Sequence, residues 1–421
     1  MPPPLSFLIY SFLLLLTGFS NRATADHHHN HQHPPYISKR TTTNTTTSNG
    51  PTCTDFMIPV TINASNKKVP TTLTSALTTT LTSTTLSNLL NNLGDDLQNA
   101  LVSGTYNISA RYCAPETIIA NRTSTIQLLV HGITYTKNYW SGDSFPGYSG
   151  TTYSWIDHAS RNGYPTLSID RLGCGNSSHP DPTFVVQVPA QVEAHHQIIR
   201  ALRSGTISEL NNQSFSKIIY VGHSYGSVMG NTLSSRYPAD ADALVLTGYT
   251  SALKPSIPGV VLTGGVIPAA LVDTSTFGSL PLGYLATSSL SGRISLFMSP
   301  STSDWDQKIA SYDWARQGTV TLGEAVSGLF ITDVAKNYTN PVFVLTGHED
   351  QIFCGLSLPA LGTTNCGNGS QGYLGKTAEL YPNARPFEYL DVPNTGHCLN
   401  FHYSANVSFE AAHGFLGRMG F

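Results

Sequence analysis

Charged side chains are scarce in this sequence. Asp, Glu, Lys and Arg together make up 11% of its 421 residues, about half the share of roughly 25% in average soluble proteins. The 22 basic and 25 acidic residues nearly cancel and leave a formal net charge of -3. Such a surface has no strong field to hold a nucleic-acid backbone or an anionic membrane, so neither is expected as a partner.

Long apolar runs are also missing after the first residues. A membrane-spanning helix needs about 20 apolar residues in a row, and only residues 5–19 come near that length. This run lies at the N-terminus, and the small residues Ala23-Thr24-Ala25 follow it. The pattern predicts a signal peptide over residues 1–25 and a secreted, extracellular protein without stable membrane insertion after cleavage. An uncleaved anchor is the alternative, because no basic residue precedes the run.

Residues 26–52 lack an apolar pattern altogether. Five histidines between His27 and His33 are followed by prolines and by a Thr-rich tract. This composition predicts a disordered leader. Clustered imidazoles can bind divalent metals, but without a folded scaffold a solvated tail is the favoured interpretation. A folded domain is expected over residues 53–421.

Cysteine is sparse, with six residues in the whole chain. Because no Cys-x-x-Cys pair and no Cys/His spacing indicates zinc, we expect no metal site. An even number of cysteines in an exported protein favours disulfides. Six cysteines allow about 15 connectivities, and the sequence does not choose among them. The pairs that we expect are Cys53 with Cys113 and Cys354 with Cys366, while Cys174 and Cys398 can pair or stay free.

Hydroxyl side chains and glycosylation sequons, which are both frequent in this sequence, can solvate a surface that has few charged side chains. An Asn-x-Ser/Thr sequon is an acceptor for N-linked sugar in an exported chain, so we expect a glycoprotein. Nine sequons are present, at Asn44, Asn63, Asn107, Asn121, Asn176, Asn212, Asn337, Asn368 and Asn406.

Short apolar runs alternate with helix-compatible segments through the body of the chain. Buried runs separated by helices predict a parallel sheet with crossover helices, which is the α/β fold class. The runs lie at residues 126–130, 166–169, 218–221, 243–246 and 342–345, and helical segments at 190–202 and 227–236. Looser alternation at 56–62 and 106–112 predicts antiparallel strands at the sheet edge, and residues 81–101 have approximately helical spacing.

Residues 251–340 do not continue this alternation of apolar runs and helical segments. Gly- and Pro-rich apolar stretches at 257–272 and a Trp-containing segment at 303–317 replace the regular alternation. Because this insertion lies between two sheet strands, we expect it to form a cap above their carboxyl ends. Its aromatic residues, such as Phe297, either line a pocket or pack in a core. The predicted architecture is a mostly parallel central sheet flanked by helices, with an inserted cap.

The sharpest local motif is Gly222-His223-Ser224-Tyr225-Gly226, a Gly-x-Ser-x-Gly between a predicted strand and a predicted helix. Its glycines leave room for a strained strand-to-helix turn that raises the serine hydroxyl above the sheet. A serine hydroxyl is a poor nucleophile at neutral pH, so it needs a general base, which in turn needs an orienting carboxylate. Ser224 is therefore the candidate nucleophile.

Candidates for both partners follow later predicted strands. Glu349 and Asp350 come after the strand at 342–345, where an acid is expected, and either can serve. His397 lies on the loop after the last strand, at 387–390, and is the best candidate for the base.

The order of serine, acid and histidine, each after a strand, resembles the α/β-hydrolase superfamily. His131-Gly132-Ile133 is similar to the family's His-Gly-x oxyanion turn. Residues 170–177 resemble the D-x-x-G-x-G-x-S loop of its epoxide-hydrolase and haloperoxidase branch. The resemblance covers roughly residues 53–421, and the chain is also similar to secreted fungal members with a serine nucleophile.

This resemblance implies a role for each residue. Ser224 would be the nucleophile, Asp350 the acid by its Gly347-x-x-Asp spacing, and His397 the base. The backbone N–H groups of Ile133 and Tyr225 would form the oxyanion hole, and no cofactor is implied. Glu349 is the alternative acid. A serine at 224 forms an acyl-enzyme, whereas the carboxylate nucleophile of epoxide hydrolases forms an alkyl ester.

These residues predict a secreted serine hydrolase, first of all a carboxylic-ester hydrolase acting on a neutral or apolar small-molecule ester. A serine peptidase or amidase is the alternative, and a non-catalytic binding module is less expected because the triad is complete. An oligomeric state is not predicted.

His131 and His223 can contact substrate or support their turns. Carboxylates of the cap that could hold a substrate amine are Asp273, Asp304, Asp306, Asp313 and Glu324.

Overall fold

The computed structural model describes residues 50–69, 97–145, 152–252, 265–328, 333–354, 366 and 372–421. The chain divides into one unit of residues 1–49 and a second of residues 50–421. The predicted signal peptide and most of the predicted leader lie outside the described residues, as do positions 81–96 of the predicted helix.

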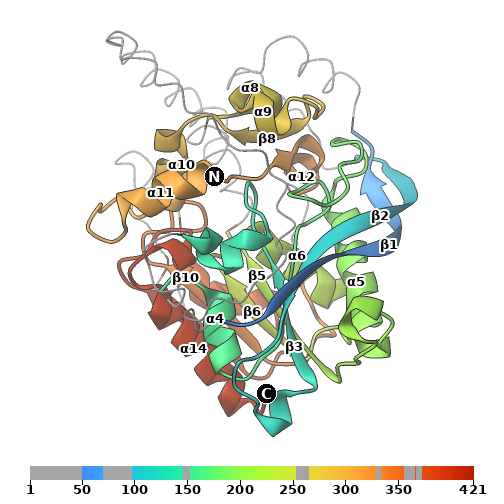
Figure 1. Ribbon diagram of the computed structural model, residues 1–421, viewed down its shortest axis with the longest axis vertical. Helices are drawn as coiled ribbons and strands as arrows, with labels where there is room; N and C mark the ends of the chain where they lie inside the picture. Colours follow the sequence, from blue (N-terminus) through green and yellow to red (C-terminus); the bar gives the residue numbers. More distant parts are fainter. Residues whose placement is uncertain are drawn as a thin grey trace, which may run out of the picture. The chain divides into compact units, whose positions relative to one another are not determined.

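An eight-stranded sheet forms the centre of this unit, in the order β1-β2-β4-β3-β5-β6-β10-β11 (Figure 1). The strands are β1 (Cys53–Lys67), β2 (Asn99–Cys113), β3 (Thr125–Val130), β4 (Thr166–Ile169), β5 (Lys217–His223), β6 (Ala243–Thr247), β10 (Val342–Gly347) and β11 (Phe387–Val392). The six strands from β4 to β11 in this order pair in parallel. This confirms the predicted α/β class with a mostly parallel sheet.

The antiparallel edge is a long ribbon of β1 and β2. The two strands pair over all 15 residues of each, and β2 then pairs antiparallel with β4. Side chains of β1 alternate between exposed and buried, as expected for a strand with one solvated face. Residues 99–101 belong to β2, so the prediction of helix is wrong there: pairing with β1 prevails over the leucine spacing.

Helices cover both faces of the sheet, which explains why β3, β4, β6 and β10 are buried at every position. Helix α5 packs against α6, and α14 packs against α4. Figure 1 shows these two pairs on opposite sides of the sheet. The four helices are α4 (Trp155–Arg161), α5 (Val188–Ser204), α6 (Tyr225–Arg236) and α14 (Ala405–Arg418).

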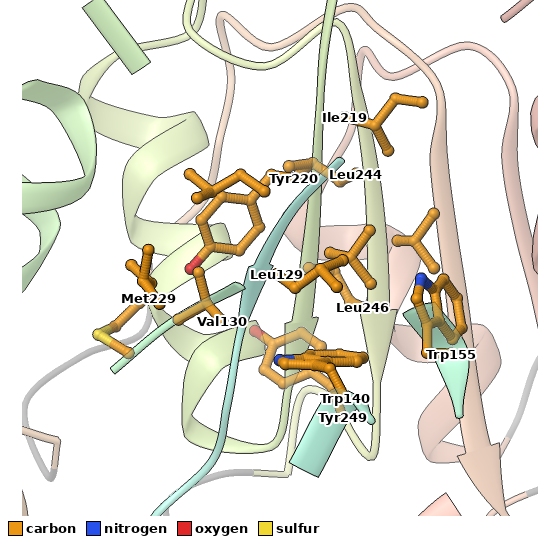
Figure 2. Packing of buried hydrophobic residues seen from close by; sticks show 14 of the residues in the cluster. Leu129, Val130, Trp140, Trp155, Ile219, Tyr220, Met229, Leu244, Leu246 and Tyr249 are labelled. Carbon is orange, nitrogen blue, oxygen red and sulfur yellow. The ribbon is translucent and has the colours of Figure 1, made fainter. Parts of the chain in front are cut away.

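Shorter helical turns connect these elements. They are η2 (Ala120–Arg122), η3 (Lys137–Trp140), η4 (Gly142–Ser144), η5 (Ser208–Leu210), α13 (Tyr373–Lys376), η7 (Thr377–Leu380) and η8 (Leu399–Phe401). The hydrophobic core lies between the sheet and its helices. Figure 2 shows the rings of Trp140, Trp155 and Tyr220 packed among aliphatic side chains of the central strands.

A second, three-stranded antiparallel sheet lies in the insertion between β6 and β10. Its order is β7-β8-β9, with β7 (Val266–Pro268), β8 (Tyr284–Thr287) and β9 (Val320–Thr321). In the described part of the insertion, five helices accompany it: α8 (Ala269–Val272), α9 (Thr274–Phe277), α10 (Leu290–Phe297), α11 (Gln307–Trp314) and α12 (Leu322–Gly328). These elements fall in the range predicted to form a cap, and Figure 1 shows them at the end of the sheet remote from the C-terminus.

Two disulfides join the pairs expected from the sequence, Cys53 with Cys113 and Cys354 with Cys366. The first disulfide joins the first residue of β1 to the last residue of β2. Cys174 and Cys398 are free and buried. Among the helices that the structure describes, none combines the length and the apolar character needed to cross a bilayer.

Candidate active site

Ser224 occupies a strained turn between β5 and α6. Its φ of 55° and ψ of -117° lie in a region that non-glycine residues seldom adopt. The surrounding glycines make this turn sterically feasible. A Cβ on Gly226 would collide with the carbonyl oxygen of Val130, and one on Gly222 would lie 2.7 Å from the carbonyl oxygen of Gly226. The motif therefore forms the turn that its spacing predicts.

Asp350 and His397 are in contact at the carboxyl ends of β10 and β11. The Nδ1 of His397 lies 2.7 Å from Oδ2 of Asp350, and both side chains are fully buried. The other carboxylate oxygen, Oδ1, accepts hydrogen bonds from the backbone N–H groups of Ile352 and Phe353, at 2.8 and 2.9 Å. Glu349 points elsewhere and accepts from the N–H of Thr395 at 2.6 Å. Of the two candidate acids, the fold brings Asp350 to His397.

The imidazole ring of His397 lies among other aromatic rings. Ring centroids of Phe297 and Phe353 both lie 5.7 Å from that of His397, and the ring of His223 lies 5.1 Å away. Within the described part of the chain, the buried Nε2 of His397 has no hydrogen-bond partner, and it is not hydrogen-bonded to Ser224. Because Nδ1 is held by Asp350, Nε2 is the nitrogen left to accept a proton.

His402 supports the loop that carries His397. Its Nε2 accepts hydrogen bonds from the backbone N–H groups of Ser299 and Gly396, at 2.9 and 3.1 Å. Its Nδ1 donates to the carbonyl oxygen of Cys398 at 2.8 Å. This pattern requires a neutral imidazole, and burial lowers the pKa of His402 to about 4.

Gly132 lies directly against Ser224. A Cβ on Gly132 would be 2.8 Å from Cβ and 3.3 Å from Oγ of the serine, so the turn after β3 and the turn after β5 meet. Tyr225 is the first residue of α6, and first-turn N–H groups have no acceptor inside a helix. The N–H groups of Ile133 and Tyr225 thus belong to the two backbone segments that flank the Ser224 hydroxyl.

The histidines of these turns have structural partners. His131 Nε2 accepts from the N–H of Arg171 at 3.1 Å, so its Nδ1 carries the proton and donates to the carbonyl oxygen of Gly132 at 2.8 Å. Burial, and next the charge of Arg171, hold the pKa of His131 well below its usual value. His223 donates through Nδ1 to Thr247 Oγ1 at 3.1 Å and stacks on Tyr139 at 4.4 Å. Both residues support their turns.

Two buried ion pairs connect the insertion between β6 and β10 to the turn after β3. Arg171 pairs with Glu324 of α12, and Arg293 of α10 pairs with Asp313 of α11 at 2.6 Å. Arg293 also donates to the hydroxyl of Thr134 at 3.0 Å. Sequence reasoning missed these pairings. Arg171 is part of the Asp170 motif, but no local pattern connects it with a residue 153 positions away.

The Asp170 motif itself holds a third buried pair. Lys137 donates to Asp170 from its backbone N–H at 2.7 Å and from Nζ at 2.8 Å. Gly175, with a φ of 53°, passes so close that a Cβ there would collide with the Asp170 carboxylate. The motif is therefore a structural support of the loop after β4, beside the candidate site.

A separate cavity of about 480 Å³ lies between α10 and α11, with Met298, Trp305 and Gln351 in its wall. Among the described residues that line it, none is charged, and Ser224, Asp350 and His397 are not among them. We do not place a substrate there. Within the described ranges, no three side chains of His, Cys, Asp or Glu gather as metal ligands would.

Comparisons with known proteins fit this architecture. The sequence model described as the alpha/beta hydrolase family matches residues 127–408, about two thirds of the chain. The comparison with curated proteins found no match.

Similar solved structures include a hydrolase from Pseudomonas aeruginosa, with 16% identity over 74% of this chain and 95% of that chain and a TM-score of 0.47. An alpha/beta hydrolase fold protein from Chitinophaga pinensis has 13% identity over 74% and 94% of the two chains, with a TM-score of 0.46. A thermophilic esterase from Thermogutta terrifontis has 14% identity over 76% and 96%, with a TM-score of 0.45. Likeness at this level says nothing about reaction or substrate. On the strength of the family match, this chain belongs to the alpha/beta hydrolase family.

Proposed function

We propose that this protein is a secreted serine hydrolase that cleaves carboxylic esters, with Ser224 as nucleophile, His397 as base and Asp350 as acid. One observation carries the proposal. The buried hydrogen bond from His397 to Asp350 leaves Nε2 of His397 without a partner among the described residues. This nitrogen and the strained turn of Ser224 both lie at the carboxyl ends of the parallel strands.

The reaction follows from these positions. His397 Nε2 takes the proton of Ser224 while Oγ attacks the ester carbonyl carbon. Asp350 keeps the proton of the imidazole on Nδ1 and stabilises the imidazolium that forms. The N–H groups of Ile133 and Tyr225 donate to the oxyanion. The imidazolium then protonates the leaving alcohol, and water attacks the acyl-enzyme with His397 again as base.

The contacts of the cap acids favour an ester over a peptide substrate. An aminopeptidase needs a carboxylate to hold the substrate amine, but each of the five candidates has a partner within the chain. Glu324 and Asp313 pair with buried arginines. Asp273 and Asp306 accept hydrogen bonds from the first turns of α9 and α11, and Asp304 accepts from Ser299 Oγ.

The aromatic surroundings of His397 suit a neutral or apolar ester. Phe297 and Phe353 lie on its ring, and an apolar acyl or alkyl group gains free energy by packing against such rings. A charged group would lose hydration there without an available counter-ion.

Export is supported by features of the fold as well as by the predicted signal peptide. The seven sequon asparagines among the described residues are all exposed: Asn63, Asn107, Asn121, Asn176, Asn212, Asn337 and Asn406. Two disulfides are typical of an oxidising compartment. We therefore propose a secreted glycoprotein.

Ser224→Ala tests the proposal most directly. The purified protein should hydrolyse p-nitrophenyl esters and take up a fluorophosphonate label, and the variant should do neither. Labelling that persists in Ser224→Ala would show that another residue is the nucleophile. No turnover and no labelling in the native protein would favour a non-catalytic binding module.

A parallel assay separates the two hydrolase candidates. Acyl esters and aminoacyl amides with matched apolar groups are given to the same preparation. We expect a higher kcat/KM for the esters than for the amides. Preference for the aminoacyl amides would make the protein a peptidase of this fold.

A further inference from the structure

The peptide group between Gly132 and Ile133 is held from its carbonyl side. The Gly132 oxygen accepts a hydrogen bond from His131 Nδ1 at 2.8 Å and another from Arg171 Nη2 at 3.2 Å. In a trans peptide the C=O and N–H bonds point in opposite directions, and this peptide is not among the cis bonds of the structure. Fixing the oxygen therefore directs the N–H of Ile133 away from Arg171.

The Arg171 guanidinium that makes this contact is itself completely buried and fixed. Its Nη1 donates to Glu324 Oε1 and, at 2.9 Å, to Gln191 Oε1. The amide of Gln191 donates to the same Glu324 oxygen at 2.8 Å. Glu324 Oε2 accepts from the N–H of Thr321 at 2.7 Å, so the carboxylate is also tied to the cap backbone.

The same ion pair contacts Tyr225, whose N–H is the second proposed oxyanion donor. The guanidinium carbon of Arg171 lies 5.3 Å from the centre of the Tyr225 ring. The hydroxyl of Tyr225 donates to the backbone carbonyl of Glu324 at 2.8 Å. The buried pair thus contacts the carbonyl side of one donor peptide and the side chain of the other donor residue.

We propose that Arg171 is a positioning residue of the oxyanion hole, which acts through the Gly132–Ile133 peptide and is held by Glu324 of the cap. Hydrogen bonds in a chain polarise one another, and those from a charged donor are stronger than neutral ones. A guanidinium on the Gly132 oxygen makes the N–H of Ile133 a stronger and better-oriented donor. This inference rests on the proposed serine-hydrolase function.

Arg293 of α10 offers a matched comparison, because it contacts the same turn after β3. It is also buried and paired with a cap carboxylate, and it donates through Nη2 to the carbonyl oxygen of Thr134 at 3.3 Å. The peptide of that carbonyl carries the N–H of Tyr135, which is not a proposed oxyanion donor. Arg293 therefore holds the turn without acting on the Ile133 peptide.

The test uses the full chain with three variants, Arg171→Lys, the charge-free pair Arg171→Met with Glu324→Gln, and Arg293→Lys. For each we measure kcat and KM on one p-nitrophenyl ester, the Ki of a trifluoromethyl ketone of matched acyl chain, and the Tm. The ketone forms a tetrahedral adduct with Ser224 whose oxygen occupies the oxyanion site. Both Arg171 variants should lower kcat about tenfold and raise Ki by a similar factor with nearly constant KM, because the donor is weakened rather than removed.

Arg293→Lys should lower the Tm comparably while the ratio of Ki to KM changes by less than about threefold. Values of kcat and Ki near those of the native protein in Arg171→Lys would overturn the inference, as would an equal rise of Ki in Arg293→Lys. If the charge-free pair does not fold, Arg171→Lys decides alone. A Ser224→Ala variant with native turnover would instead contradict the proposed function.

Discussion

The imidazole of His397 donates a 2.7 Å hydrogen bond to Asp350 although 47 residues separate them in the chain. The carboxylate that receives this bond is held by two backbone N–H groups of its own loop. The acid is therefore fixed by its own loop as well as by the histidine, and the neighbouring Glu349 has a different partner. These separate contacts make the two adjacent carboxylates experimentally distinguishable.

Asp350→Asn should lower kcat by about 10²- to 10⁴-fold, because a neutral amide neither stabilises the imidazolium nor enforces the proton on Nδ1. Glu349→Gln, the matched control on the adjacent position, should keep kcat within about tenfold of the native value, since Glu349 accepts its hydrogen bond from the backbone of Thr395 and not from His397. Steady-state kinetics on one ester compares both. The reverse order of effects would identify Glu349 as the acid.

Gly132→Ala should impair the reaction by crowding the nucleophile. The added Cβ would lie 2.8 Å from Ser224 Cβ, and displacing a reacting group by a fraction of an ångström lowers kcat by about 10- to 100-fold. Gly414→Ala in α14 is the control, because the nearest atom to its Cβ is an Arg418 nitrogen at 3.8 Å. That change should retain full activity and raise stability by up to about 1 kcal/mol. Equal kcat values in the two variants would show that a Cβ at position 132 does not disturb Ser224.

Lowering the pH should destabilise the folded chain through His402, which supports the loop that carries His397. The pKa of His402 is about 4 in the folded chain, against 6.5 ordinarily, so the unfolded chain binds its proton first. Below pH 6.5 the contribution of this neutral histidine to stability is progressively lost, and the loss is complete near pH 4. For this group alone the free energy of unfolding should be about 2 kcal/mol smaller at pH 5 than at pH 7.

Urea unfolding of the native chain and of His402→Gln at these two pH values isolates that contribution. The variant should be less stable at pH 7, yet it should lose less stability between pH 7 and pH 5. Buried His195 and His413, whose pKa values burial lowers to about 3, leave an acid sensitivity in both proteins. Parallel pH profiles for the two proteins would contradict the assignment.

The disulfide between Cys53 and Cys113 should contribute strongly to stability, because it links residues 60 positions apart. Loop-closure entropy predicts a loss of up to about 4 kcal/mol when both cysteines become alanine. Calorimetry of the double variant measures this loss as a lower Tm. The single variant Cys174→Ala, which removes a free buried thiol, should lower the Tm less. A native Tm in the double variant would mean that the β1–β2 ribbon is held by its hydrogen bonds and packing alone.

Much of the architecture follows from local patterns in the sequence. The apolar runs at 166–169 and 342–345 lie in β4 and β10, because strands buried on both faces need uninterrupted apolar side chains. The Gly-x-Ser-x-Gly motif also has a local cause, since its glycines are needed within the same turn. Residues 99–101 show the limit of such patterns. Their leucine-rich context suggested a helix, and only pairing with β1 makes them a strand.

The sequence by itself determined the fold class, and Ser224 and His397 as candidates, since these depend on residue type, spacing and chain order. The pairing of the cysteines was decided by the tertiary structure, because the sequence does not choose among the possible connectivities. Tertiary structure alone decided that Glu324 meets Arg171 across 153 residues. It also brought Asp350, which the family resemblance already favoured over Glu349, to His397. Side chains of adjacent residues point in different directions, and the partner of each depends on the path of the chain between them. Short-range patterns carry no information about that path, which is why these contacts emerge only after the chain has folded.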